Sequence, residues 1–574
     1  MKIQDKKIKR NFVPEDINLD RWEEIETLLQ TLLNEELRSG PDLENWILKI
    51  SELSAVLHQE RTLRHVRMIC HTDNQEYRAR YNYFIQEIEP KYKPLFHKLA
   101  DKLLSCPYKR DLPHERYGAY LRNREINARL FCQENIPLKT KETNLKTFYQ
   151  QLTGKMSIWY RGKELPLAKA FVYVNERERK IRKEVWERIS NRWLRDKDTI
   201  EDIFEKQIRL RHQIAVNAGF QNYRDYIFQA YKRFDYTTED CLLFHKTCEK
   251  VIMPLFIRIH EERKRKLRLK TLKPFDMQVD ENDSLCLKPF SGIDQLINGT
   301  REAFGRIDSK LEAYFTRMIK DNLLDLENRK GKAPGAYCFK LEECGLPFIF
   351  MNATGSHQDV MRLLHEAGHA FHHLSTNTSP DLYGKAPKEM CELASLGMEL
   401  LGLNHLDVFY SDEELRRAKR IYFQKMISYF PGIATIDAFQ HWIYTHEGHT
   451  PEQRRNYWQE LMNKYLGIVD FSDYKPMLEV MYHQTPLLFQ APFYFIEYAI
   501  AWLGALQIWR NYQKDPEETI EKYLYALSLG GSKPLPELYK SAGVVFGFSE
   551  KIIGELMDML EHELEKTEIM TNDQ

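Results

Sequence analysis

The chain has 574 residues, of which 43% are hydrophobic and 29% are charged, a balance typical of a soluble globular protein with two or three lobes. Its 84 Lys and Arg residues match its 84 Asp and Glu residues, so the net charge gives no reason to expect nucleic acid or an anionic membrane as a partner. We interpret the one basic run, at 263–270, as a solvated helix face or loop.

Targeting signals and membrane spans are not expected either. The charged start is not followed by an apolar run, so we expect no secretory signal. The most apolar stretch, at 486–509, is interrupted by Gln490, Glu497 and Gln507, which predicts a buried helix rather than a membrane span. The nine cysteines are odd in number and form no CxxC pair, which favours reduced thiols in a cytoplasmic protein.

Helical periodicity dominates the chain from its beginning. Apolar residues at three- and four-residue steps predict one helix from Trp22 to Leu33, ended by Gly40-Pro41, and another from Leu43 onward. A further charge-rich helical pattern lies around 176–193, and the segment 271–291 has the composition of a surface excursion. We expect an N-terminal helical lobe at 1–180 and a catalytic region at 181–574.

Strand character is scarce. Two short aromatic runs, at 335–341 and 347–352, are joined by a turn at 342–345. The predicted class is therefore mostly α, with one small β-sheet next to the helix that follows.

That helix carries the pattern with the most chemical information. The segment 359–374 reads DVMRLLHEAGHAFHHL, with Asp359 as the expected N-cap. His365 and His369 are four residues apart and so lie on one helix face, opposite the apolar stripe. Two imidazoles at this spacing can reach one zinc ion about 2.0–2.1 Å from their nitrogens. Glu366 is then placed to act as general base on a water at the metal.

An HExxH pattern also arises by chance, with roughly 0.05 accidental matches in a chain of this length with 19 histidines. The context must therefore decide. Gly368 lies inside the predicted helix, where glycine costs about 1 kcal/mol relative to alanine, so we expect a close packing contact or a ligand there.

A catalytic zinc site needs a third protein ligand. The metzincin pattern is excluded because Ser375 stands where it needs histidine, and the spacing of zinc aminopeptidases falls on Lys388. Glu389, Glu392 and Glu399 share one face of an otherwise apolar helical segment, which predicts that they point into a buried polar site. One of these acids would bind the metal, and the others would orient histidine N–H groups.

These motifs resemble the M3 family of metallopeptidases, the thimet oligopeptidase and oligoendopeptidase F group, and most closely its oligoendopeptidase F side. HEAGHAFHH at 365–373 is similar to the family's HExGHxxH, and ELAS at 392–395, followed by Glu399, is similar to its E-x-(A/P)-S-x-x-x-E element. RKGKAPGAYC at 329–338 resembles its R-x-G-K-x-P-G-(A/G)-Y-C stretch.

The resemblance implies the details that residue spacing leaves open. Glu392 becomes the third ligand of a single zinc ion, with Glu389 and Glu399 as outer partners. The fold implied is two helical lobes around a deep substrate channel that admits short unstructured peptides.

A later segment is similar to the part of the family that supplies a histidine and tyrosines to the cleft. The resemblance implies catalytic roles for His483, Tyr498 and Tyr494, with His483 and Tyr498 donating to the oxyanion. A second histidine–glutamate–histidine sequence, at 446–449, has its histidines only three residues apart beside Gly448, and we interpret it as a loop.

The expected function is a zinc-dependent oligoendopeptidase acting on short peptides through a zinc-activated water, with neither nucleic acid nor membrane as partner and the oligomeric state left open. The strand at 348–352 would pair with the substrate backbone. Two alternatives remain: a zinc aminopeptidase, and a helical binding protein that holds zinc without turnover.

Overall fold

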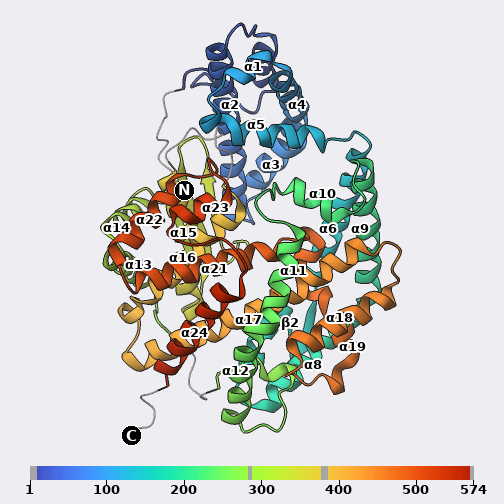
Figure 1. Cartoon of the computed structure of the whole chain (residues 1–574), viewed down its shortest axis with the longest axis vertical. Helices are drawn as coiled ribbons and strands as arrows, with labels where there is room; N and C mark the ends of the chain where they lie inside the picture. Colours follow the sequence, from blue (N-terminus) through green and yellow to red (C-terminus); the bar gives the residue numbers. More distant parts are fainter. Residues whose placement is uncertain (1–9, 282–286, 377–385, 569–574) are drawn as a thin grey trace. The chain divides into compact units, whose positions relative to one another are not determined.

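The computed structural model describes residues 10–281, 287–376 and 386–568, which fall into two compact units (Figure 1). The first unit comprises Met1–Ala128, Leu287–Ala418 and Ile500–Phe546, and the second comprises Arg129–Cys286, Lys419–Ala499 and Gly547–Gln574. Each unit is thus formed by three separate segments of the chain. The expected lobe boundary near residue 180 falls at the start of α8 (Arg179–Arg195) and stays a prediction.

The N-terminal part of the first unit is a helical bundle. Its helices are α1 (Trp22–Asn34), α2 (Gly40–Cys70), α3 (Gln75–Tyr83), α4 (Glu89–Ser105) and α5 (His114–Arg129). The predicted apolar stripe of α1 is confirmed, because Ile25, Leu29 and Leu32 are fully buried against α2 residues such as Trp46. Trp46 also donates its indole N–H to the carbonyl of Leu32, 2.8 Å away, so its one polar group is satisfied in the core.

A three-stranded sheet lies in the same unit. Its strands are β3 (Leu324–Glu327), β4 (Tyr337–Leu341) and β5 (Leu346–Ala353), in the order β3-β5-β4. The predicted pair β4 and β5 is confirmed as an antiparallel hairpin in which Phe339 faces Phe348. The sequence prediction missed β3, which is only four residues long and pairs parallel to β5.

The sheet packs on α15 (His357–Ser375), and α15 packs on α16 (Lys388–Leu403). The other helices of this unit are α13 (Ile293–Ile307), α14 (Ser309–Lys320), α22 (Pro516–Ser528) and α23 (Leu535–Ser541). Phe371 of α15 meets Phe304 of α13 edge-on, with ring centroids 4.9 Å apart. The apolar face predicted for α15 is therefore buried, which turns its histidine face the other way.

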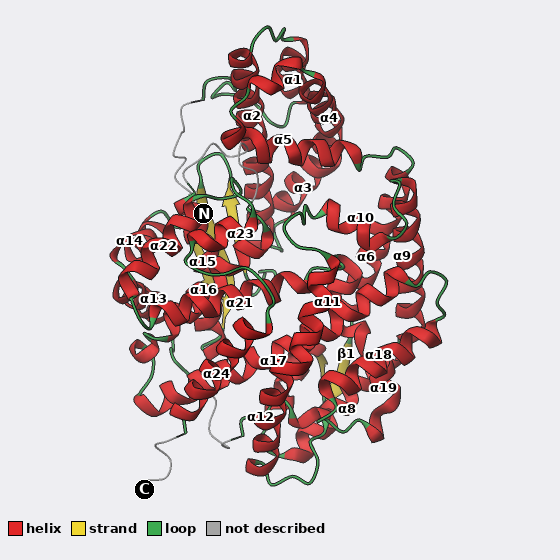
Figure 2. Ribbon diagram, in the orientation of Figure 1, coloured by secondary structure: helices red, strands yellow, loops and turns green. Residues whose placement is uncertain are grey.

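The second unit is also mostly helical (Figure 2). Besides α8 its helices include α6 (Asn135–Gly154), α9 (Lys197–Asn217), α10 (Tyr223–Ala230), α11 (Thr238–Thr247), α12 (Met253–Lys266), the part of α17 (Asp412–Thr445) from Lys419 on, α18 (Pro451–Leu466) and α24 (Glu550–Lys566). A hairpin of β1 (Ser157–Tyr160) and β2 (Lys163–Pro166) adds a second small sheet. The prediction of only one sheet was therefore wrong, while the mostly-α class is confirmed.

The segment predicted as a surface excursion, at 271–291, is partly buried. Residues 282–286 of it lie outside the described residues. Asp276 is completely buried, and its carboxylate accepts from Arg179 at 2.7 Å and Arg182 at 3.0 Å. This pairing explains how an acidic, proline-containing segment is held in the interior.

The basic run at 263–270 begins on the last turn of α12, as the helix-face interpretation expects. Its charges are not simply solvated, however. Arg263 is largely buried and donates to the carbonyl of Val279 at 2.6 Å, while Lys266 pairs with Glu281 at 3.2 Å.

The apolar stretch at 486–509 forms two helices, α20 (Pro486–Gln490) and α21 (Phe495–Tyr512). The turn between them includes Phe493 with a φ of +67°. Two of the three polar residues that interrupt the stretch are buried and paired: Glu497 lies 2.7 Å from Arg233, and Gln507 donates to Val545 at 2.9 Å. None of the helices in the described ranges is long and apolar enough to cross a membrane.

Candidate metal centre

The helix α15 begins at His357, two residues before the expected N-cap. Asp359 lies in the first turn, and its carboxylate accepts the backbone N–H of Ser356 at 3.0 Å and that of Thr354 at 2.8 Å. Ser356 is the N-cap in a reciprocal capping box with Asp359. The prediction that Asp359 is the N-cap was therefore wrong, and the segment that joins β5 to α15 ends at Ser356.

The structure brings together the three predicted metal ligands. The Nε2 atoms of His365 and His369 lie 3.7 and 3.9 Å from Oε2 of Glu392, and the ligand atoms of all three are within 4.8 Å of one another. In a tetrahedral zinc site with bonds of about 2.0–2.1 Å, donor atoms lie about 3.3 Å apart. The donor set therefore fits a zinc ion after small side-chain movements.

Glu399 takes the outer position that the sequence allowed for it. Its Oε1 lies 2.6 Å from Nδ1 of His365, so the carboxylate holds the other ring nitrogen and leaves Nε2 directed at Glu392. This carboxylate–histidine arrangement is the usual support of a metal-binding imidazole. Ser395 supports the third ligand, because its hydroxyl lies 3.3 Å from Oε2 of Glu392.

Buried acids dominate the electrostatics of this cluster. Burial raises the pKa of Glu366 to about 7, and the carboxylate of Glu392 adds to the rise while His365 opposes it. Although burial alone would lower it, hydrogen bonding to Glu399 and the neighbouring carboxylates raise the pKa of His365 to about 9. Several carboxylates around two imidazoles attract positive charge, which a divalent cation supplies.

Gly368 is required by the contact between the two helices that carry the ligands. A Cβ at this position would lie 2.5 Å from the carbonyl oxygen of Ala394 and 2.6 Å from Cα of Ser395. Both are backbone atoms of α16, which cannot swing aside as a side chain does. The expected close packing contact is confirmed, and it sets the distance between the histidines and Glu392.

We therefore expect Gly368→Ala to destabilise the protein by about 1–3 kcal/mol, through overpacking of the α15–α16 contact. Gly432 provides a matched control, since it lies inside α17 and a Cβ there meets nothing within 4 Å. Gly432→Ala should stabilise by about 0.4–1 kcal/mol. Urea unfolding of the two variants is the measurement, and an unchanged midpoint for Gly368→Ala would contradict the packing argument.

The strand β4 borders the metal centre. Burial and, to a smaller extent, the carboxylate of Glu366 raise the pKa of the Cys338 thiol, and β4 packs on α15, the helix that carries Glu366. The predicted pairing of substrate with 348–352 is wrong, because β5 is the central strand and both of its edges are taken by β3 and β4. The strand at the edge of this sheet near Glu366 is β4.

The motif at 329–338 has a structural role in the loop that leads into β4. The ammonium group of Lys332 is buried and lies 2.9 Å from Oδ1 of Asp325 and 2.8 Å from the carbonyl of Glu327. Arg329 binds the same carboxylate at 2.6 and 2.8 Å. These contacts tie the loop to β3 and so fix the start of the edge strand.

The predicted residues His483, Tyr494 and Tyr498 belong to the second unit. His483 is buried, and its Nε2 lies 2.9 Å from Oε2 of Glu201, which Arg454 also binds. Although burial alone would raise it, His483 and Arg454 hold the pKa of Glu201 at about 2. Glu201 is therefore an ionised acceptor, and Nε2 of His483 carries the proton between them.

The two tyrosines lie together at the start of α21. Their ring centroids are 5.2 Å apart, and both side chains are half-buried. Tyr494 precedes the helix, which begins at Phe495, so the two rings meet across the start of the helix. The roles of His483, Tyr494 and Tyr498 at the metal stay predictions.

The second histidine–glutamate–histidine sequence is a loop, as predicted. The helix α17 ends at Thr445, α18 begins at Pro451, and Gly448 between them has a φ of +77°. These residues cannot present two histidines on one helix face.

Comparison with known proteins decides the family. The sequence model of Peptidase family M3 matches residues 172–557, and that of the Peptidase M3 N-terminal domain matches residues 14–131. The chain belongs to peptidase family M3. This confirms the predicted resemblance and, at the level of the family, the metallopeptidase class.

Individual relatives agree with that assignment. The chain is 25% identical to an oligoendopeptidase F homolog of Borreliella burgdorferi over 386 residues, 64% of this chain and 62% of the relative. It is 30% identical to oligopeptidase PepF of Bacillus subtilis over 240 residues, 39% of this chain and 34% of that relative. In these alignments the chain spans less than two thirds of the relatives' own length.

Solved structures share the fold along nearly the whole chain. A structure of PZ peptidase A with an inhibitor has a TM-score of 0.87 at 23% identity, covering 97% of this chain and 99% of that one. A putative oligoendopeptidase F from Bacillus anthracis has a TM-score of 0.83 at 23% identity, with the same coverage.

Proposed function

We propose that the chain is a zinc-dependent oligoendopeptidase that hydrolyses internal peptide bonds of short unstructured peptides. The observation that carries this proposal is the convergence of His365, His369 and Glu392. Glu366 is buried on α15, the helix that also carries the two histidines. Membership of peptidase family M3 and relatives named oligoendopeptidase F support it. One zinc ion held by these three residues, in a cytoplasmic protein, completes the proposal.

His365, His369 and Glu392 would hold the zinc ion, which would supply Lewis-acid chemistry by lowering the pKa of a bound water and polarising the scissile carbonyl. Glu366 takes the proton from the attacking water as general base and later delivers it to the leaving amine as general acid. Its burial suits this exchange, because a carboxylate in a dry site accepts and releases a proton near neutral pH. Glu399 keeps the His365 ring in the orientation that metal binding needs.

The edge strand β4 is the structural basis for tolerance of varied peptide sequences. A peptide added alongside β4 is held by backbone hydrogen bonds, which do not depend on its side chains. Since β4 packs on α15, the helix that carries Glu366, such a peptide would run past the base. A deep channel would restrict entry to unfolded chains, and equally rapid cleavage of a folded protein and of its short peptides would contradict that restriction.

The proposed hydrogen-bond donors to the oxyanion are His483 and Tyr498. Tyr494, whose ring lies beside that of Tyr498, is the third proposed catalytic residue of this segment. Nδ1 of His483 is buried with no hydrogen-bond partner among the described residues, while Nε2 donates to Glu201. His483 can therefore donate through Nδ1 only as the imidazolium, and burial lowers its pKa. Tyr498 offers a hydroxyl donor and needs no such change.

Blocked peptides test the proposal against its two alternatives. We expect the zinc-loaded protein to cut peptides with acetylated N-termini and amidated C-termini at internal bonds, as readily as the free peptides. An aminopeptidase needs the free amine and would leave the blocked peptides intact. A binding protein without turnover would cut neither form. Mass spectrometry of the products separates these outcomes.

A further inference from the structure

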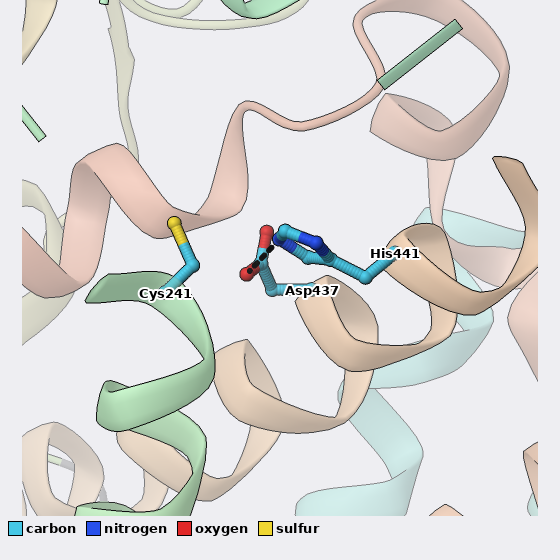
Figure 3. Close-up of side chains that lie close together, drawn as sticks. All are labelled: Cys241, Asp437 and His441. Atoms are coloured by element: carbon cyan, nitrogen blue, oxygen red, sulfur yellow. Dashed lines mark ion pairs between the residues drawn. The ribbon is translucent and has the colours of Figure 1, made fainter. Parts of the chain in front are cut away.

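A second cluster of potential metal ligands lies inside the second unit. Cys241 lies on α11, and Asp437 and His441 lie on α17, with the His441 ring against the carboxylate of Asp437 (Figure 3). Their ligand atoms are all within 4.8 Å of one another. The cluster shares no residue with the candidate metal centre, which lies in the first unit.

The spacing of these residues is that of ligand pairs on helices. Asp437 and His441 are four residues apart on α17, and Cys241 is four residues before His245 on α11. Side chains at this spacing lie one above the other on a single face. Two such faces meet here, because Nε2 of His245 lies 2.9 Å from Oδ2 of Asp437.

The cluster is buried, and two of its polar atoms are left without partners. Cys241 and Asp437 are completely buried, and His441 is 4% exposed. Oδ1 of Asp437 and Nδ1 of His441 have no hydrogen-bond partner among the described residues, while Nε2 of His441 lies 3.4 Å from Oδ2 of Asp437 in an ion pair. Buried polar atoms normally have partners, so two unsatisfied atoms in one place point to a ligand.

We propose that Cys241, Asp437 and His441 bind a second metal ion, of the zinc class, that joins α11 to α17. A thiolate, an imidazole and a carboxylate are ligands that zinc accepts together. A divalent cation also balances the two negative charges of the thiolate and the carboxylate, which lowers the free-energy cost of burying these side chains. His245 contacts Oδ2 of Asp437, which leaves Oδ1 for the metal, and so acts as a positioning residue.

The role of this ion is structural. The site is enclosed by α11, α17 and aromatic side chains, with the ring of Phe493 5.3 Å and that of Phe228 6.1 Å from the His441 ring. A peptide cannot reach a site so enclosed, whereas an ion can enter as the two helices pack. In this proposal each chain holds two ions rather than the one expected from the sequence.

Cobalt substitution tests the proposal, because a cysteine thiolate bound to Co²⁺ gives a ligand-to-metal charge-transfer band in the near ultraviolet. The proposed ligands of the other site are histidines and a glutamate, which give no such band. We expect the full chain to bind about two Co²⁺ ions and to show this band. Cys241→Ser should lose the band and about one ion, as measured by absorption and elemental analysis.

Two control variants make the result specific. Cys248→Ser changes another fully buried cysteine of the same unit, seven residues further on, and should keep the band. His369→Ala removes a ligand of the candidate metal centre and should also keep it, so failure of one site does not mimic failure of the other. Absence of the band in the parent protein would overturn the proposal, as would an undiminished band in Cys241→Ser. The parent measurement decides even where a variant does not fold.

Discussion

Replacement of Glu366 by glutamine is expected to lower kcat by about 10²–10⁴-fold, the usual contribution of a general acid–base group. Glutamine keeps the size and hydrogen-bonding shape of the side chain but cannot take a proton. The ligands His365, His369 and Glu392 are unchanged, so the variant should bind zinc as the parent does. Steady-state kinetics on a blocked peptide, with zinc content measured on the same sample, give both quantities.

Glu389→Gln is the matched control for this experiment. Glu389 is also a buried glutamate, 5% exposed, and lies on α16 in the same unit. A loss of kcat at Glu389, the proposed outer partner, that is much smaller than the loss at Glu366 would show that the effect at Glu366 comes from its position rather than from removal of any buried carboxylate. A Glu366→Gln variant that binds zinc and matches the parent's turnover would contradict the role of Glu366 as general base.

Removal of the third ligand is expected to have the second large effect. Loss of an outer partner of a metal ligand costs about 10–100-fold in metal affinity. Glu392→Gln removes a direct ligand, so zinc affinity should fall by more than that range, and activity at low zinc should fall with it. Competition with a chromophoric chelator measures the affinity.

Comparison of the zinc affinities of Glu392→Gln and Glu389→Gln distinguishes the two candidates for the third ligand. Spacing on the helix alone does not choose between them, whereas the structure places Glu392 Oε2 3.7 and 3.9 Å from the two histidines. As a proposed outer partner, Glu389 should matter less, so Glu389→Gln should lose no more than about 10–100-fold in zinc affinity, less than Glu392→Gln. The reverse order of affinities would reassign the third ligand.

The sequence predicts the local features of the metal centre well, because helical spacing fixes which side chains share a face. His365 and His369 follow from the four-residue step, and the role of Gly368 follows from the cost of glycine inside a helix. Glu399 was one of two candidates for the outer position, and only the packing of α15 on α16 shows that it meets His365. Distances between helices depend on such packing and are not encoded in spacing.

Two of the features that the sequence prediction missed were missed for different reasons. The strand β3 is four residues long, too short for an alternating pattern, and its pairing with β5 is what removes β5 as a docking edge. The cluster of Cys241, Asp437 and His441 joins residues about two hundred positions apart. The only sequence signal for it is a pair of four-residue steps, Cys241 with His245 and Asp437 with His441, which many helices contain by chance.

The most direct test of the central claim is digestion of a mixed library of short peptides, read by mass spectrometry with and without a chelator. The zinc-loaded protein is predicted to cut internal bonds in many sequences, to lose this activity with the chelator and to regain it on addition of zinc. Internal cleavage that proceeds equally fast in the chelated protein would contradict a catalytic zinc site at His365, His369 and Glu392.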